Sequence, residues 1–507
     1  MSQQKIKLAS ASFIGISSIV GSGWLFAPYV AAHISGPAAI LSWTIGTLII
    51  YLLAMCYAEI ATLHPIRGLS AVITTLSHNQ YFGFPFAIAN WLGIVAVIAL
   101  EADATVQYLV NIVPSWHHLF FDATESMTLI GSLLALVFVI FYTLVNFWGI
   151  KLLAKANNLI TVIKLAVPVI TVIILLCAAF HPHNFTSAGG SFMPYGFTSV
   201  IVTILTAGII VSFNGFQTIL SFSSEIHNPT RTIPWALTIA IFVSFILYIV
   251  LQVAFIGALP PSFLAHGWDS FNMSAPIVQL VGILGLNFFI VVLYIGAVAA
   301  PMGTALAFTG SASRMFTAMA RKKQMPQFFD NVHPIYGLSR RSLIFNALLA
   351  VVFLFSFNSW SDLAQVLGLF HILSYKTVPL ALTVFRKDVK REEYKFRMPF
   401  GVIISFILFT IFNILISLGS YKIVFEITVI VLIFQLVFII TSVINKVDSL
   451  MQALRKCIFL IIYLATLPMI SYISPLNAAL LSTVWYFVVI GVYSLVIFII
   501  LTSRRAH

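Results

Sequence analysis

Two apolar stretches of this sequence are interrupted by residues that break helices. Gly21-Ser22-Gly23 lies within the apolar run 9–32, and Asn214-Gly215 lies within the run 198–223. Lipid offers the backbone no hydrogen bonds, so irregular structure at membrane depth survives only where it lines a cavity in the protein. Two such breaks in one chain predict a binding site. For either break alone, close packing of glycines between helices is the alternative interpretation.

The chemistry of such a site follows from the ends of the half-helices. A half-helix N-terminus presents free N–H groups and the positive end of the dipole, which suit a carboxylate, whereas freed carbonyl oxygens suit an ammonium group. Together they would hold the α-carboxyl and α-amino groups of an amino acid. The residues expected to bind it are Ser18, Gly21, Ser22, Gly23, Phe213, Asn214, Gly215 and Gln217.

Aromatic side chains beside the breaks are candidate gates for this site. Trp24 directly follows the first break, and Phe213 directly precedes the second. Aromatic residues make up 14% of the chain, so a packing role for both is equally open.

Ionisable residues inside the apolar runs form a second group of candidates. Lys164 lies in the run 158–180, roughly 10 Å deep at 1.5 Å per residue; Glu101 and Asp103 lie in the third run, and Lys376 lies in the tenth. Charges at membrane depth are costly and usually functional. Glu101 and Asp103 point about 200° apart on a helix, so only one can face a central cavity, as a proton carrier or as the partner of a lysine. A Glu101–Lys376 pair is one hypothesis, and contact of one of them with water is the other.

A polar turn follows the second break. Glu225 and Arg231 flank Asn228-Pro229. We expect them, together with Glu59 near the end of the second run, to cap the helix and to hold an inner gate. A purely structural cap is the other interpretation.

The composition indicates which elements must position these residues. The 507-residue chain is 61% hydrophobic and only 8% charged, against about 25% in a soluble domain, which is typical of an all-α polytopic membrane protein. About 14 runs approach the length of about 20 residues that a membrane helix needs. Paired breaks in corresponding helices predict inverted repeats. We expect them at 1–180 and 181–385, with additional helices at 386–507.

The distribution of positive charge tests this arrangement. With the N-terminus in the cytoplasm, all but three of the 26 Lys and Arg residues fall in predicted inside segments; the exceptions are Lys164, Lys376 and Lys422. The positive-inside rule expects this asymmetry. We therefore predict a multi-pass plasma-membrane protein with both termini in the cytoplasm and with basic loops that meet lipid headgroups.

Other partner classes are disfavoured. The net charge of +12 is spread over many segments rather than gathered on one face, which argues against nucleic-acid binding. Cys56, Cys177 and Cys457 lie singly in apolar runs, and His181 and His183 are too few for a metal site. We expect no metal and no cofactor.

Five motifs occur in order along the chain. They are IVGSGWLFAP, YAEIATLHP, VNFWGIKLLAKANNLITVIKLAVPVI, FNGFQTILSFSSEIHNPTRTIP and SRMFTAMARKKQMPQFFDNVHP. Over roughly residues 8–400 the chain resembles the APC (amino acid–polyamine–organocation) superfamily of permeases. The resemblance implies a LeuT-type fold, a 5+5 inverted repeat with discontinuous helices 1 and 6.

The resemblance also implies roles for single residues. Lys164 stands where proton-coupled relatives carry a lysine in the space that sodium occupies in sodium-coupled ones, and loss of its proton would weaken the contact between helices 1 and 8. Gln217 stands where some relatives carry a carboxylate. The segment LEADATVQYL and the region of Lys164 favour the branch of bacterial acidic-amino-acid/proton symporters, and hence the bacterial inner membrane.

The expected function is that of a secondary active transporter that takes up an amino acid with protons by alternating access. The absence of a phosphate-binding loop motif argues against direct ATP drive. An amino acid/amine exchanger and a non-transporting nutrient sensor are the alternatives. An intramembrane enzyme is disfavoured, because the acyltransferase-like His117-His118 and Asp122 stand alone in a predicted outer loop. The last four predicted helices leave oligomer formation open.

Overall fold

The computed structural model describes residues 5–66, 69, 73–122, 124–148, 150–186, 190–333 and 338–503. Within these residues every regular element is a helix, and extended pairing is limited to two isolated bridges, Ile6–Ile226 and Phe121–Met127. The all-helical architecture expected from the composition is confirmed.

The helices fall into three stretches of the chain. The first contains α1 (Leu8–Ile19), α2 (Gly23–Ser35), α3 (Ala39–Leu63), α4 (Ile73–Ser77), α5 (Gln80–Val110), α6 (His117–Phe120), α7 (Leu129–Trp148) and α8 (Ile150–Ala178). The second contains α9 (Gly196–Thr206), α10 (Ile209–Ser212), α11 (Thr218–Ser221), α12 (Pro229–Ala258), α13 (Pro276–Ile283), α14 (Asn287–Arg321), α15 (Arg340–Ser356), α16 (Trp360–Tyr375) and α17 (Thr377–Asp388). The third contains α18 (Gly401–Ser417), α19 (Tyr421–Ile444), α20 (Leu450–Tyr472) and α21 (Thr483–Ser503).

Ten helical runs in the described part of the chain are long and apolar enough to cross a membrane, and α2 and α3 together form the first of them. Three further apolar helices, α1, α9 and α18, are shorter. Two of these three belong to the interrupted segments, where a break divides a span into pieces below the usual length. The count of about 14 spans and the 5+5 repeat remain predictions.

The first interruption lies where the sequence predicts it, since α1 ends at Ile19 and α2 begins at Gly23. The second is longer than expected. Helix α9 ends at Thr206, and one helical turn, α10, follows. The chain leaves the helical conformation again over 213–217. Gly208, which has a left-handed φ of 69°, accounts for the earlier end. The polar turn that the sequence predicts after the second break lies between the end of α11 at Ser221 and the beginning of α12 at Pro229.

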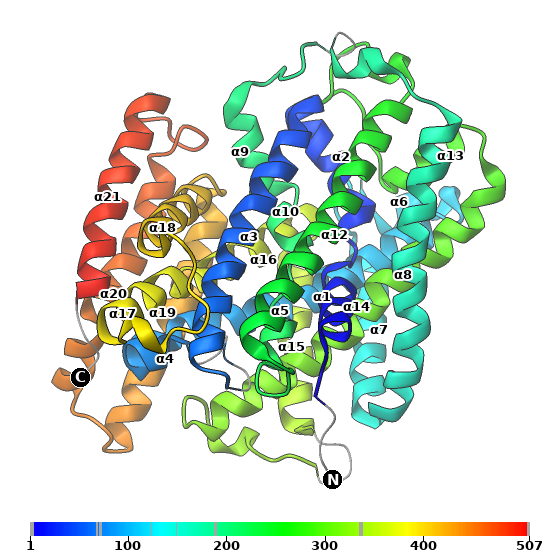
Figure 1. Ribbon diagram of the computed structural model, residues 1–507. Helices are drawn as coiled ribbons and strands as arrows, with labels where there is room; N and C mark the ends of the chain where they lie inside the picture. The colour runs from blue at the N-terminus through cyan, green and yellow to red at the C-terminus, as the bar shows by residue number, and fades with distance from the viewer. Residues whose placement is uncertain are drawn as a thin grey trace.

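Burial divides the bundle into a centre and a periphery. In the most apolar 18-residue stretch of each helix, 94% of α5 and 100% of α16–α17 lie inside the protein, whereas only 28% of α21 does. Figure 1 shows α5 and α16 in the middle of the view and α18–α21, coloured yellow to red, gathered at the left. Any site built on α5 and α16 is therefore enclosed by other helices.

Candidate functional site

The two broken segments meet at their breaks. Gly23, the first residue of α2, lies so close to Ser212 at the end of α10 that an added Cβ would overlap the Ser212 side chain. At the second break Gly215 has a φ of 108°, and a Cβ there would overlap the carbonyl group of Ser18. Both glycines are thus required by close approach, and the predicted pairing of the two breaks is present in space.

Two side chains satisfy backbone groups that the breaks set free. The hydroxyl of Tyr248 in α12 lies 2.9 Å from the carbonyl oxygen of Ser212 and 3.3 Å from that of Ile19. Gln217 accepts a hydrogen bond from the amide of Gly215 at 3.2 Å. Helix ends leave such groups without intrahelical partners, so these contacts hold the two breaks open and in register.

A small cavity lies between the breaks. Its volume is about 30 Å³, room for roughly two or three water molecules. Among the residues predicted to bind substrate, five line it: Ser18, Gly21, Ser22, Gly23 and Asn214. Phe213, Gly215 and Gln217 do not line it. The Phe213 ring packs against Trp43 and Tyr248, and Gly215 and Gln217 act through the contacts described above.

Three polar atoms on the residues lining this cavity have no hydrogen-bond partner among the residues that the structure describes. They are Oε2 of Glu101, Nδ2 of Asn214 and Oγ1 of Thr304. Buried polar groups in proteins are normally satisfied. Three unsatisfied groups around one cavity therefore point to a ligand or water as their missing partner.

Glu101 is the charged residue of the cavity. Its side chain is only 3% exposed, and Oε1 accepts a hydrogen bond from the amide of Ser22 at 3.4 Å. Lys164, in α8, is also buried, at 6% exposed. Asp103 is fully buried away from the cavity, and neither of its carboxylate oxygens has a partner within the described part of the chain. Of the two acidic residues of α5, Glu101 is thus the one that faces the breaks.

The proposed Glu101–Lys376 pair is wrong. The ammonium group of Lys376 donates instead to Oδ1 of Asn413 at 2.7 Å and to the hydroxyl of Tyr463 at 2.6 Å. These partners belong to α18 and α20. The sequence indicates that both charges are buried, but it does not show which neighbouring helix each one faces.

Comparison with known proteins identifies the family. A model of the amino acid permease family matches residues 6–434. The chain belongs to this family, within the APC superfamily. It is 34% identical over 97% of its length to the glutamate/serine transporter AimA of Bacillus subtilis, of which the match covers 92%. It is also 34% identical to the aspartate-proton symporter of that organism, over 77% of this chain and 75% of the symporter.

More distant matches extend to eukaryotes. The human cationic amino acid transporter 4 is 26% identical over 74% of this chain and 58% of its own length. The resemblance to APC permeases near the acidic-amino-acid symporters is confirmed, and with its apolar helices the permease is a multi-pass membrane protein.

Aromatic residues close the permease cavity in a way that the sequence did not predict. Trp24 is fully buried and does not line the cavity. Trp360, at the start of α16, does line it: its indole N–H donates to Oγ of Ser22 at 3.3 Å, and its ring stacks on Phe26. Thr304 and Tyr248 were also missed. For Thr304 and Tyr248 the available signal was a polar atom within an apolar run, whereas Trp360 lies in the polar segment 358–362.

Backbone pairing joins the segment before α1 to the turn before α12. The amide of Ile6 donates to the carbonyl of Glu225 at 3.0 Å, and the amide of His227 donates to the carbonyl of Ile6 at 2.9 Å. Arg231 is exposed and lies in the first turn of α12, whose N-cap is Asn228. Glu59 belongs to a different contact: Arg386 donates to both of its oxygens, at 2.7 and 2.6 Å. The expected grouping of Glu59 with Glu225 and Arg231 is therefore replaced by a buried Glu59–Arg386 pair.

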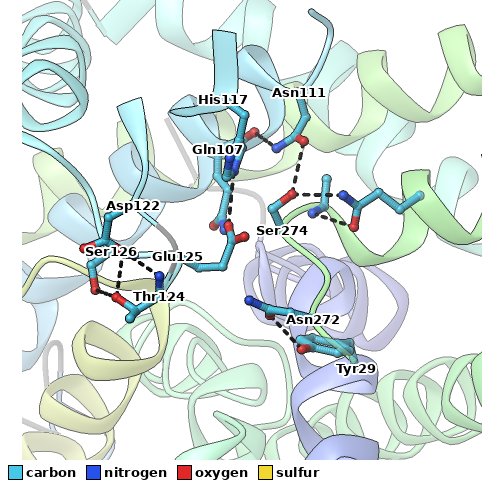
Figure 2. Close-up of polar contacts among 12 residues, drawn as sticks. Tyr29, Gln107, Asn111, His117, Asp122, Thr124, Glu125, Ser126, Asn272 and Ser274 are labelled. Carbon is cyan, nitrogen blue, oxygen red and sulfur yellow. Dashed lines mark hydrogen bonds and ion pairs between the residues drawn. The ribbon is translucent and has the colours of Figure 1, made fainter. Parts of the chain in front are cut away.

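Figure 2 shows polar contacts among residues of α2, α5 and the loops on either side of α6 and before α13. The hydroxyl of Tyr29 donates to Oδ1 of Asn272 at 3.0 Å, and Ser274 donates to Oδ1 of Asn111 at 3.1 Å. These bonds fasten the segment before α13 to α2 and α5.

The acyltransferase-like residues have structural partners in the same region. Nε2 of His117 lies 3.1 Å from a carboxylate oxygen of Glu125. Asp122 accepts hydrogen bonds from the hydroxyl and amide of Thr124, which lower the pKa of its carboxyl group. Both side chains of the motif thus have polar partners in the segment that follows α6.

Proposed function

We propose that this permease takes up an amino acid together with protons by alternating access, with its substrate held between the two helix breaks. The observation that carries the proposal is the cavity on which both broken segments, the Glu101 carboxylate and three unsatisfied polar atoms converge. Backbone N–H groups of α2 would bind the substrate carboxylate, and carbonyls at the ends of α1 and α10 would bind its ammonium group. The small volume suits a closed state that must open to admit substrate.

Glu101 and Lys164 would carry the proton coupling. Both are buried, and Glu101 touches the first break through Ser22. A change in protonation at either residue would therefore alter the charge balance beside the substrate. Ionisable groups at this depth mark proton relays in transporters.

The names of the relatives suggest which substrates to test first. Glutamate, serine and aspartate appear in them. Besides Glu101, the polar residues that line the cavity are all uncharged: Ser18, Ser22, Ser212, Asn214 and Thr304. A small hydroxyl side chain would find partners there, whereas an acidic one would need Lys164 to turn toward it.

The proposal includes the arrangement in the membrane. We propose that 1–180 and 181–385 form a LeuT-type 5+5 inverted repeat and that 386–507 adds further helices, giving about 14 spans. The protein would lie in the bacterial inner membrane, with both ends of the chain in the cytoplasm.

Uptake into proteoliposomes tests the function. We expect labelled glutamate, serine or aspartate to accumulate when the outside is made acidic, without sodium. Lys164→Met should abolish the dependence on the gradient, whereas the exposed Lys422→Met should not. A requirement for sodium, or proton dependence that survives Lys164→Met, would overturn the coupling. Uptake that requires an amino acid inside the vesicle would identify an exchanger, and binding without uptake would identify a sensor.

A further inference from the structure

Lys376 occupies an unusual position at the junction of α16 and α17. Its side chain is fully buried, and no ion pair in the described part of the chain includes it. Its ammonium group donates to Asn413 and Tyr463 and lies 5.2 Å from the centre of the Tyr463 ring. A lysine buried among neutral groups is costly whether it keeps its proton or loses it, so its position needs an explanation beyond packing.

The partners of Lys376 extend through the last helices of the chain. The hydroxyl of Tyr463 in α20 donates to Oδ1 of Asn413 in α18 at 2.9 Å. Nδ2 of Asn413 donates in turn to Oγ of Ser494 in α21 at 2.9 Å. One ammonium group thus fastens the α16–α17 junction to three of the four helices in 386–507.

The residue before Lys376 reaches in the opposite direction. The hydroxyl of Tyr375 accepts a hydrogen bond from Nε2 of Gln217 at 2.8 Å. Oε1 of Gln217 accepts from the amide of Gly215. Two adjacent residues at the end of α16 therefore bond in different directions. Tyr375 contacts the second break, and Lys376 contacts the C-terminal helices.

We propose that Lys376 is a positioning residue through which α18, α20 and α21 fix the geometry of the second break. Its side-chain nitrogen fixes the end of α16 against α18 and α20. The neighbouring Tyr375 is thereby held where its hydroxyl bonds Gln217, and Gln217 in turn bonds the Gly215 amide. The proposal assigns a role to residues 386–507 and stands apart from the proposed transport activity.

Amide hydrogen exchange of the full-length protein in lipid nanodiscs tests this role without any substrate. Lys376→Met removes the charge while leaving the bond between Asn413 and Tyr463 intact. We expect exchange over 213–218 to become roughly 2- to 30-fold faster, the range for mutations that alter coupling between sites. Tyr486→Phe is the matched control. It deletes an equally buried hydroxyl bonded to Ser417, a link between α21 and α18 alone, and should leave 213–218 unchanged.

Two further variants keep the test decisive if Lys376→Met fails to fold. Tyr463→Phe removes one acceptor of the ammonium group and should accelerate exchange over 213–218 more weakly. Tyr375→Phe cuts the link to Gln217 directly, and in that background Tyr463→Phe should add nothing at 213–218. Faster exchange confined to α18, α20 and α21, or additive effects of the two variants, would overturn the proposal.

Discussion

The first helix break and the α16–α17 junction each hold one charged side chain in the interior, but they use it differently. Glu101 at the first break keeps one carboxylate oxygen without a partner, and it lines a cavity. Lys376 at the junction lies outside that cavity and donates to two side chains of other helices. Burial alone therefore does not distinguish a group that exchanges partners from one that fixes a structure. Contact with the cavity does, because Glu101 lines it whereas Lys376 and Asp103 do not.

The largest expected effect separates Glu101 from its neighbour on α5. Glu101→Gln keeps an acceptor for the Ser22 amide but removes the charge, so proton-driven uptake should fall roughly 10²-fold, the scale of a lost proton-transfer group. Asp103→Asn is the matched control, because Asp103 is equally buried but does not line the cavity. Initial rates in proteoliposomes measure both. Equal losses in the two variants would break the distinction between them.

Gly215→Ala tests the close approach of the second helix break to α1. The new Cβ would overlap the Ser18 carbonyl, and the φ of 108° disfavours alanine, so we expect a loss of about 2–4 kcal/mol in stability. Gly491→Ala in α21 meets nothing within 4 Å and should leave stability equal or slightly higher. Thermal unfolding in detergent compares them. A tolerated Gly215→Ala would show that the breaks need not approach so closely.

Tyr248→Phe tests the hydroxyl that bridges both breaks. Two freed carbonyl groups would lose their shared donor, which should cost about 1–2 kcal/mol. We expect substrate affinity to weaken together with stability, because the same carbonyls are proposed to face the substrate ammonium. If stability falls while the KM for uptake stays constant, these carbonyls are structural only.

The smallest effect is expected at the membrane edge, where a charge is fully paired. Asp448 accepts from Lys456 at 2.9 Å and from Tyr81 at 2.8 Å. The hydrogen bond from Lys456, followed by that from Tyr81, lowers the pKa of Asp448. Its stabilisation should therefore be complete above the unfolded pKa of about 4 and lost as the pH falls through the lower folded pKa.

Asp448→Asn measures that stabilisation. At pH 7 it should cost at most about 1 kcal/mol, as for other accessible ion pairs, and the difference from the unaltered protein should vanish in acid. A difference that grows toward low pH would contradict the assignment. Transport should be unaffected, unlike in the Glu101 variant.

The sequence by itself determined the class of protein, the family and the two places where helices break. Gly21-Ser22-Gly23 and the Pro229 start of α12 are local signals, because glycine and proline act on the backbone where they stand. The five motifs that identified the family are also local patterns in the sequence. Even the choice of Glu101 and Lys164 as buried functional charges follows from the cost of an ionisable group in an apolar run.

Only the tertiary structure decided which partner each buried group meets. Glu101 faces the first break, Lys376 meets Asn413 and Tyr463, Glu59 meets Arg386, and Tyr248 spans two breaks that lie far apart in the chain. In a soluble helix the polar stripe shows which side faces outward. In a membrane helix both the lipid-facing and the protein-facing sides are apolar. The sequence therefore shows that a residue is buried, while the packing of the helices decides what lies beside it.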